Sequence, residues 1–143
     1  MVTSKFPSLI KPSKKTKFKI DFDWWQKNDR DWRVYLKGFL CPEHQDLFAS
    51  YTGDEQIDWV DPKTAVVKSV DALQHVLMNH CAKQDSFKYS TTALVDSVFR
   101  VFLANGNKPL SCDELASILN KSPELILRTF SSHRVYKGIR PVI

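Results

Sequence analysis

The chain has 143 residues, of which 43% are hydrophobic and 12% aromatic, so it is long and apolar enough to form one ordinary domain or two small ones. This composition excludes an intrinsically disordered chain, and the sequence has no run of about eighteen apolar residues that would predict a membrane-spanning helix. Three cysteines are too few for a disulfide framework. Because residues 1–10 also lack the apolar core of a secretory signal, we expect a cytoplasmic protein without membrane contact.

The net charge of +5 is distributed unevenly along the chain. Residues 1–20 carry six lysines and no acid, residues 21–89 carry eight Lys and Arg against twelve Asp and Glu, and residues 90–143 carry seven against four. Basic segments attract polyanions such as nucleic acids, although a lysine-rich terminus can equally be a solubilising tail.

Residues 1–17 contain two prolines and lack hydrophobic periodicity, which predicts a mobile basic arm. If the arm binds nucleic acid, the residues we expect to contact its backbone are Lys14, Lys15 and Lys17.

Residues 18–89 form a tryptophan-rich segment that predicts a small α/β subdomain. Apolar and charged residues alternate over 18–22, which is typical of a strand, and apolar residues recur at helical spacing over 24–39, which fits one helix or two short ones. Short β-prone runs on either side of the Asp61-Pro62-Lys63 turn predict a hairpin. Apolar spacings of three and four over 70–83 predict an amphipathic helix.

The same segment contains a cysteine–histidine pattern. Cys41 and His44 have the C-x2-H spacing of half a zinc knuckle, and His80 with Cys81 supplies a second pair, for which His75 is an alternative ligand. Structural zinc takes four nitrogen or sulfur ligands, so we expect a structural zinc site at these residues. Residues five or six apart on a regular helix point about 120–140° from each other, so a pairing with His75 would need a distorted helix end. The alternative is that the cysteines are small buried apolar residues and the histidines are partly exposed.

Residues 90–143 predict three helices followed by a β segment. The first helix covers about 92–104 and ends before Gly106, the second begins at Ser111 with Glu114 completing a capping box, and the third begins at Ser122 before a proline. Apolar and basic residues then alternate over 134–142, which predicts a strand or a small hairpin wing.

The stretch PLSCDELASILNKSPELILRTF, residues 109–130, is similar to the helix 2–turn–helix 3 part of many bacterial regulators. With the preceding helix and the following β segment, residues 90–143 resemble the winged-helix, or helix-turn-helix, superfamily. One departure is that the turn has no glycine, so Asn120 takes its place. The resemblance implies an α+β chain in which the tryptophan-rich α/β subdomain packs on a C-terminal winged helix.

This resemblance also implies a small transcriptional regulator that binds nucleic acid, in the first place double-stranded DNA, with the third helix in the major groove. Base edges would then be read by Arg128, Thr129 and Ser132, and phosphates or the minor groove would be contacted by Arg134, Lys137 and Arg140.

The alternative is a protein-interaction or assembly subunit, whose winged helix docks on a protein partner or on a second copy of the chain. We expect no enzyme, because the four glycines are isolated and form no phosphate-binding loop, and the carboxylates over 21–31 are typical of a solvated face.

Overall fold

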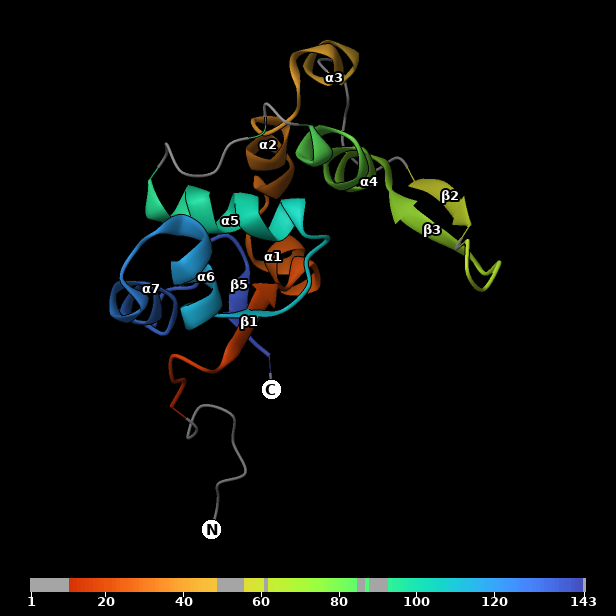
Figure 1. Cartoon of the computed structure of the whole chain (residues 1–143). Helices are drawn as coiled ribbons and strands as arrows, with labels where there is room; N and C mark the ends of the chain where they lie inside the picture. The colour runs from red at the N-terminus through yellow and green to blue at the C-terminus, as the bar shows by residue number, and fades with distance from the viewer. Residues whose placement is uncertain (1–10, 49–55, 61, 85–86, 88–92, 143) are drawn as a thin grey trace. The chain divides into compact units, whose positions relative to one another are not determined.

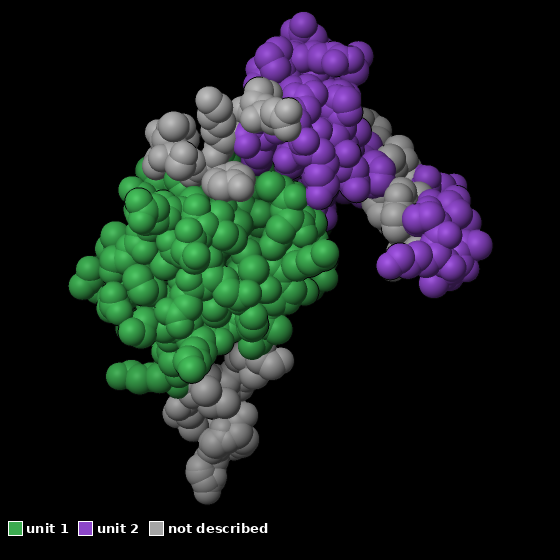
Figure 2. All heavy atoms as spheres, in the orientation of Figure 1, with its two compact units in different colours: residues 1–28, 88–143 green, residues 29–87 purple. Residues whose placement is uncertain are grey.

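The computed structural model describes residues 11–48, 56–60, 62–84, 87 and 93–142. The chain divides into two compact units, unit 1 with residues 1–28 and 88–143 and unit 2 with residues 29–87 (Figure 2). The described residues form seven α-helices and two small antiparallel sheets, so the fold is of the mixed α+β class (Figure 1).

Unit 1 is built around a three-stranded antiparallel sheet with the order β4-β1-β5. Its strands are β1 (Lys17–Ile20), β4 (Leu110–Ser111) and β5 (Ile139–Pro141). The alternation predicted over 18–22 is confirmed for Phe18 and Ile20, each 1% exposed, whereas Phe22 is not in the strand and begins α1. Because β1 lies between the other two strands, the beginning of the chain pairs with residues 110–111 on one side and with residues 139–141 on the other.

The helices of unit 1 are α1 (Phe22–Asn28), α5 (Leu94–Ala104), α6 (Cys112–Leu119) and α7 (Pro123–Phe130). The apolar face of α5 forms the core of this unit, and Val98, Phe99 and Phe102 on it are completely buried. Trp25 of α1 packs edge-on against Phe99, with ring centroids 5.3 Å apart. Trp25, at 1% exposure, therefore belongs to the core of this unit.

Local signals place the two helices that follow. The predicted capping box is present, since the Ser111 hydroxyl accepts from the Glu114 amide and the Glu114 carboxylate accepts from the Ser111 amide. Asn120 ends α6 in the left-handed conformation with φ of 54°, the position for which the sequence offered no glycine. The Ser122 hydroxyl then caps α7 by accepting from the Leu125 amide, and α6 and α7 lie side by side (Figure 1).

The β segment after α7 is a single strand, and the described residues 131–142 form no hairpin wing. Instead of a second wing strand, β5 pairs with β1. The turn before it places Gly138 at a φ of +75°, with its carbonyl accepting from the Asp21 amide at 2.7 Å. A Cβ at this position would lie 2.8 Å from Cβ of Trp25, so the close packing of β5 on α1 requires glycine.

Unit 2 contains two short helices, a hairpin and a longer helix. Its elements are α2 (Trp32–Lys37), α3 (Pro42–Leu47), β2 (Gln56–Val60), β3 (Val67–Asp71), α4 (Ala72–Asn79) and a 3-10 helix η2 (Cys81–Lys83). The predicted hairpin is confirmed, although its second strand begins at Val67 rather than Ala65. The following helix begins later than expected because Asp71 ends β3 and caps α4 by accepting from the Gln74 amide.

The grouping of segments differs from the division at 17/18 and 89/90 expected from the sequence. Residues 18–28 belong with the C-terminal helices, because β1 completes the sheet formed with β4 and β5. The two helical pieces expected over 24–39 consequently fall in different units, α1 in unit 1 and α2 in unit 2. Lys17 is the first residue of β1 and not part of an arm, whereas residues 1–10 of the predicted arm lie outside the described part of the chain.

Candidate functional site

One half of the candidate metal site lies at the end of α4. This helix ends at Asn79, and His80 takes a non-helical conformation with φ of −125° and ψ of −64°. The chain then turns into η2, which begins with Cys81. His80 and Cys81 are therefore placed by the irregular end of α4 rather than by a regular helix.

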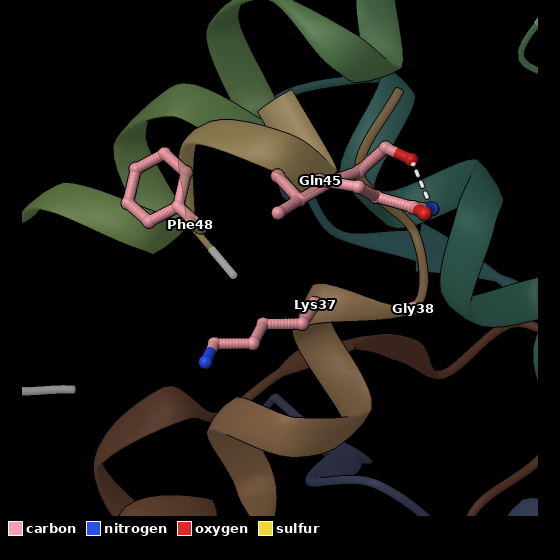
Figure 3. A pocket seen from close by; sticks show the side chains of 5 residues that line it. Lys37, Gly38, Gln45 and Phe48 are labelled. Atoms are coloured by element: carbon pink, nitrogen blue, oxygen red, sulfur yellow. Dashed lines mark hydrogen bonds between the residues drawn. The ribbon is translucent and has the colours of Figure 1, made fainter. Parts of the chain in front are cut away.

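The other half lies at the beginning of α3. Cys41 precedes this helix in an extended conformation, and Pro42 occupies its first position. The His44 ring folds back so that its Nδ1 lies 3.1 Å from Sγ of Cys41. The Gln45 side chain donates to the Leu40 carbonyl at 2.9 Å and fixes the chain just before the cysteine (Figure 3).

The two halves meet within unit 2. Sγ of Cys81 lies 3.4 Å from Sγ of Cys41, and the rings of His44 and His80 have centroids 4.5 Å apart. Candidate ligand atoms of Cys41, His44 and His80 all lie within 4.8 Å of one another, so these three residues lie close enough to hold a metal ion. Among the described residues neither Cys81 nor His75 belongs to this group of three. Cys81 is a candidate fourth ligand through the closeness of its sulfur to that of Cys41, whereas the His75 side chain contacts Asn79.

These distances can be compared with those around tetrahedral zinc. Bond lengths of about 2.3 Å to sulfur and 2.0–2.1 Å to nitrogen place two sulfurs about 3.8 Å apart, and a sulfur and a nitrogen about 3.6 Å apart. The observed separations of 3.4 Å and 3.1 Å are shorter by about half an ångström or less. A small outward movement of the side chains would therefore make room for the ion.

The protonation state of the thiol also bears on metal binding. Burial raises the pKa of Cys81 to about 11, so at neutral pH its thiol is protonated and donates to Cys41. A metal must displace this proton, because the thiolate is the ligand. The Gln84 amide lies 3.2 Å from Nε2 of His80 and helps to hold this exposed ring in place.

A buried ion pair supports the scaffold around α4. The Arg33 guanidinium lies 2.7 Å from the Asp71 carboxylate, whose side chain is only 6% exposed. Because Asp71 also caps α4, this pair ties α2 to the beginning of the helix that carries His80 at its other end. Leu36 and Leu73 are completely buried and add apolar packing in the same unit.

Residues on either side of Cys41 and His44 in the chain line a shallow pocket of about 280 Å³. They are Lys37, Gly38, Leu40, Gln45 and Phe48 (Figure 3). Among the described residues that line it, Lys37 is the single ionisable side chain.

The predicted nucleic-acid contacts lie in unit 1, and several of their charged groups have protein partners. Lys14 pairs with Glu124 at 2.9 Å, Lys17 pairs with Glu114, and Arg140 pairs with Asp21 at 3.1 Å. Hydrogen bonds from the lysines hold the pKa of Glu124 and of Glu114 below its ordinary value. The sequence gives no sign of these long-range pairs beyond the acids in the first turns of α6 and α7 and the aspartate just before α1.

The remaining predicted contacts differ in how they are held. The Thr129 and Ser132 hydroxyls donate to backbone carbonyls of α7, at 2.8 Å and 3.2 Å, which reduces their capacity to read bases. Lys15, Arg128 and Arg134 are exposed, and the Arg134 guanidinium lies over the Tyr136 ring. Lys137 is partly exposed in the left-handed turn before β5.

Charge is separated between the two units more sharply than the linear sequence suggested. Unit 1 carries fifteen Lys and Arg against six Asp and Glu, a net charge of +9, whereas unit 2 carries six against ten, a net charge of −4. The separation arises because β1 brings the lysine-rich beginning of the chain into the same unit as α6 and α7.

Compared with models of protein families, with curated proteins and with solved structures, the chain matches none. Among the described helices, none combines the length and the apolar character that crossing a bilayer requires. Arguments about function therefore rest on the charge and geometry of this chain.

Proposed function

We propose that the chain is a nucleic-acid-binding protein, with double-stranded DNA as its ligand, and that unit 1 makes the contact. The observation that carries this proposal is the net charge of +9 on unit 1, compared with −4 on unit 2. Neutralisation of phosphates by Lys and Arg supplies most non-specific affinity for DNA, so a unit with this charge is suited to hold a nucleic-acid backbone.

The arrangement of helices in unit 1 supports a winged-helix type of docking. The pair α6 and α7 is joined by a tight turn at Asn120, and α5 packs against α6. In such a pair the second helix enters the major groove, where Arg128 on α7 has the fork that matches guanine. Arg134 follows α7 and is also exposed, a position suited to a phosphate contact.

The ion pairs of Lys14 and Lys17 are compatible with this role. Their side chains are 46% and 50% exposed, and exposed ion pairs contribute little to stability. Each lysine neutralises a glutamate in the first turn of α7 or α6 that would otherwise repel phosphate. A phosphate can therefore replace the glutamate as the partner of the lysine.

We also propose that the cluster in unit 2 holds a structural zinc ion. Two thiols and two imidazoles are a donor set that zinc favours, and four protein ligands leave no open position for a substrate. The ion would link the beginning of α3 to the segment after α4. It would thereby add stability to a unit whose helices are short.

Fluorescence anisotropy with a labelled generic duplex across a salt series tests the DNA proposal. We expect micromolar binding that weakens steeply with salt and is lost in Arg128→Ala/Arg134→Ala. The matched control is Arg30→Ala/Lys63→Ala, which removes the same charge from exposed positions in unit 2 and should bind like wild type. Absence of binding at low salt by folded protein would contradict the proposal.

A specific observation favours a second function, docking on a protein partner. Ile118 of α6 and Leu125 of α7 are 44% and 38% exposed, so apolar side chains lie on the helix pair proposed to face DNA. Exposed apolar groups on such a surface are typical of protein interfaces. Loss of a co-purifying partner in Ile118→Ser/Leu125→Ser, with DNA binding retained, would support the docking function for these apolar side chains, whereas loss of DNA binding by the folded variant would assign them to the DNA contact.

A further inference from the structure

The two sulfur atoms of the cluster are unusually close. Sγ of Cys41 and Sγ of Cys81 lie 3.4 Å apart, although the residues are 40 positions apart in the sequence. A disulfide would shorten this distance to about 2.0 Å, whereas zinc would lengthen it to about 3.8 Å. The observed separation of the two sulfurs lies between these two states.

We infer that Cys41 and Cys81 form a zinc–disulfide switch, in which the same two sulfurs bind metal when reduced and pair with each other when oxidised. The inference rests on the zinc site proposed above. Formation of the disulfide removes two of the four ligands, and His44 and His80 alone make a much weaker site. Oxidation therefore releases the metal.

Accessibility sets the order of the chemical steps. Cys41 is the more exposed of the two residues, since Cys81 is only 1% exposed, so we place the first oxidation at Cys41. The sulfur of Cys41 attacks the O–O bond of hydrogen peroxide, which gives a sulfenic acid at Cys41 and one molecule of water. Sγ of Cys81 then attacks Sγ of Cys41, and the S–O bond breaks with release of a second water. The two thiols lose two electrons in total, and the peroxide gains them.

The consequence for the fold differs from that of simple metal loss. The disulfide joins the residue before α3 to the first residue of η2, which are the segments that the metal would link. The oxidised unit keeps a covalent connection there, while the histidines become free to move. We expect the switch to change the metal content of the protein without unfolding unit 2.

The chain contains its own control. Cys112 at the beginning of α6 is completely buried and belongs to unit 1. Burial is the principal cause that raises its pKa to about 11, so this thiol should be unreactive at neutral pH. Three thiols are thus present, and the inference predicts that two of them disappear together.

The test uses the full chain loaded with one equivalent of zinc and titrated with hydrogen peroxide at neutral pH. A chromogenic chelator measures released zinc, a thiol reagent counts free cysteines in denaturant, and intact mass with peptide mapping locates the bond. We expect zinc release to parallel the loss of two thiols, with a mapped Cys41–Cys81 link and Cys112 unchanged. Cys112→Ala should behave like wild type, whereas Cys81→Ser should form no internal link and should accumulate a sulfenic acid at Cys41.

Metal analysis before the titration separates the two proposals. A protein that keeps its zinc and its three thiols under excess peroxide overturns the switch and leaves the zinc site standing. Cross-linking through Cys112, or between chains alone, also overturns it. A protein that takes up no zinc but forms the Cys41–Cys81 bond contradicts the zinc proposal and overturns the switch, because the two thiols then pair without any metal to release.

Discussion

The Asn107 side chain binds both backbone groups of Ile20. Its amide nitrogen donates to the Ile20 carbonyl at 2.8 Å, and its amide oxygen accepts from the Ile20 amide at 2.9 Å. On this side of the sheet β4 pairs with Lys17 and Phe18 only, so Asn107 continues the edge of the strand with a side chain. A residue in the loop after α5 thus satisfies the last residue of β1, which is 87 positions away.

This relationship predicts that Asn107→Ala destabilises the protein. Both backbone groups of Ile20 would lose a part-buried hydrogen bond, at a cost of about 1–3 kcal/mol. The measurement is urea unfolding followed by tryptophan fluorescence. Because Asn107 has a φ of 61°, Asn107→Gly removes the same bonds without backbone strain and should show whether strain contributes to the loss. The Asn105 side chain bonds to the backbone of nearby Lys108. Asn105→Ala should therefore have a smaller effect.

A second prediction concerns the ion pair between Arg33 and Asp71. In Asp71→Ala the guanidinium loses its partner and α4 loses its cap, and we expect a loss of about 2–4 kcal/mol. Chemical denaturation measures it. Asp58→Ala, at an exposed position on β2, is the control and should lie within about 0.5 kcal/mol of wild type. Equal stability of the two variants would show that the pair contributes nothing net.

How much of this structure could be predicted from the sequence depends on how local each feature is. The capping box of Ser111 and Glu114 involves neighbours three residues apart, so the letters alone indicate it. The end of α6 at Asn120 can likewise be predicted, because this residue lies between two segments with helical periodicity. The spacing of Cys41 and His44, and of His80 and Cys81, also indicates two ligand pairs. Because a structural zinc site needs four ligands, the sequence predicts that the two pairs lie close together.

The features that were not predicted are non-local. Nothing near Lys17 indicates that β1 will lie between β4 and β5, because strand pairing over such a distance depends on the whole core. The same applies to the pair of Lys14 and Glu124, which are 110 positions apart. The sequence predicts an arm at Lys14 and Lys17 because their partners, Glu124 and Glu114, lie far away in the sequence.

The zinc proposal predicts which histidine matters. With His80→Ala we expect zinc content to fall far below one equivalent, whereas His75→Ala should retain full content, since His75 lies outside the cluster in the described residues. Zinc at a hundred times its Kd should stabilise wild type by about 2.7 kcal/mol and stabilise His80→Ala much less. Plasma emission analysis and thermal unfolding with and without chelator are the measurements. Equal zinc loss in the two variants would assign the alternative ligand.

Cys112 predicts a decrease in stability at alkaline pH. Burial, followed by the neighbouring Asp113 charge, raises the pKa of this thiol to about 11 in the folded chain, above about 8.5 when unfolded. The stabilising difference is fully present below the unfolded pKa, and it is lost as the pH rises through the folded value. The free energy of unfolding should therefore fall between about pH 8.5 and 11. In Cys112→Ala this part of the fall should be absent, and an unchanged pH profile would contradict the assignment.

Removal of the acid that partners Lys14 should strengthen DNA binding. Glu124 lies in the first turn of α7 and pairs with Lys14 at 2.9 Å. In Glu124→Gln the negative charge beside the proposed groove-binding helix disappears, and Lys14 becomes available to a phosphate. We expect affinity for a generic duplex to rise roughly 3–10-fold at low salt, with a steeper dependence on salt concentration. Anisotropy titrations at several salt concentrations measure both quantities.

The control for that prediction is Glu43→Gln, which makes the same change at an exposed position in unit 2. If the contact lies on unit 1, this variant should change affinity by less than about twofold, because Glu43 has no part in the proposed contact and exposed charges are screened by salt. Equal gains in the two variants would mean that net charge alone drives binding and that α7 has no special place in it. A loss of affinity in Glu124→Gln would show that the pair with Lys14 is needed to hold the beginning of α7 in its binding position.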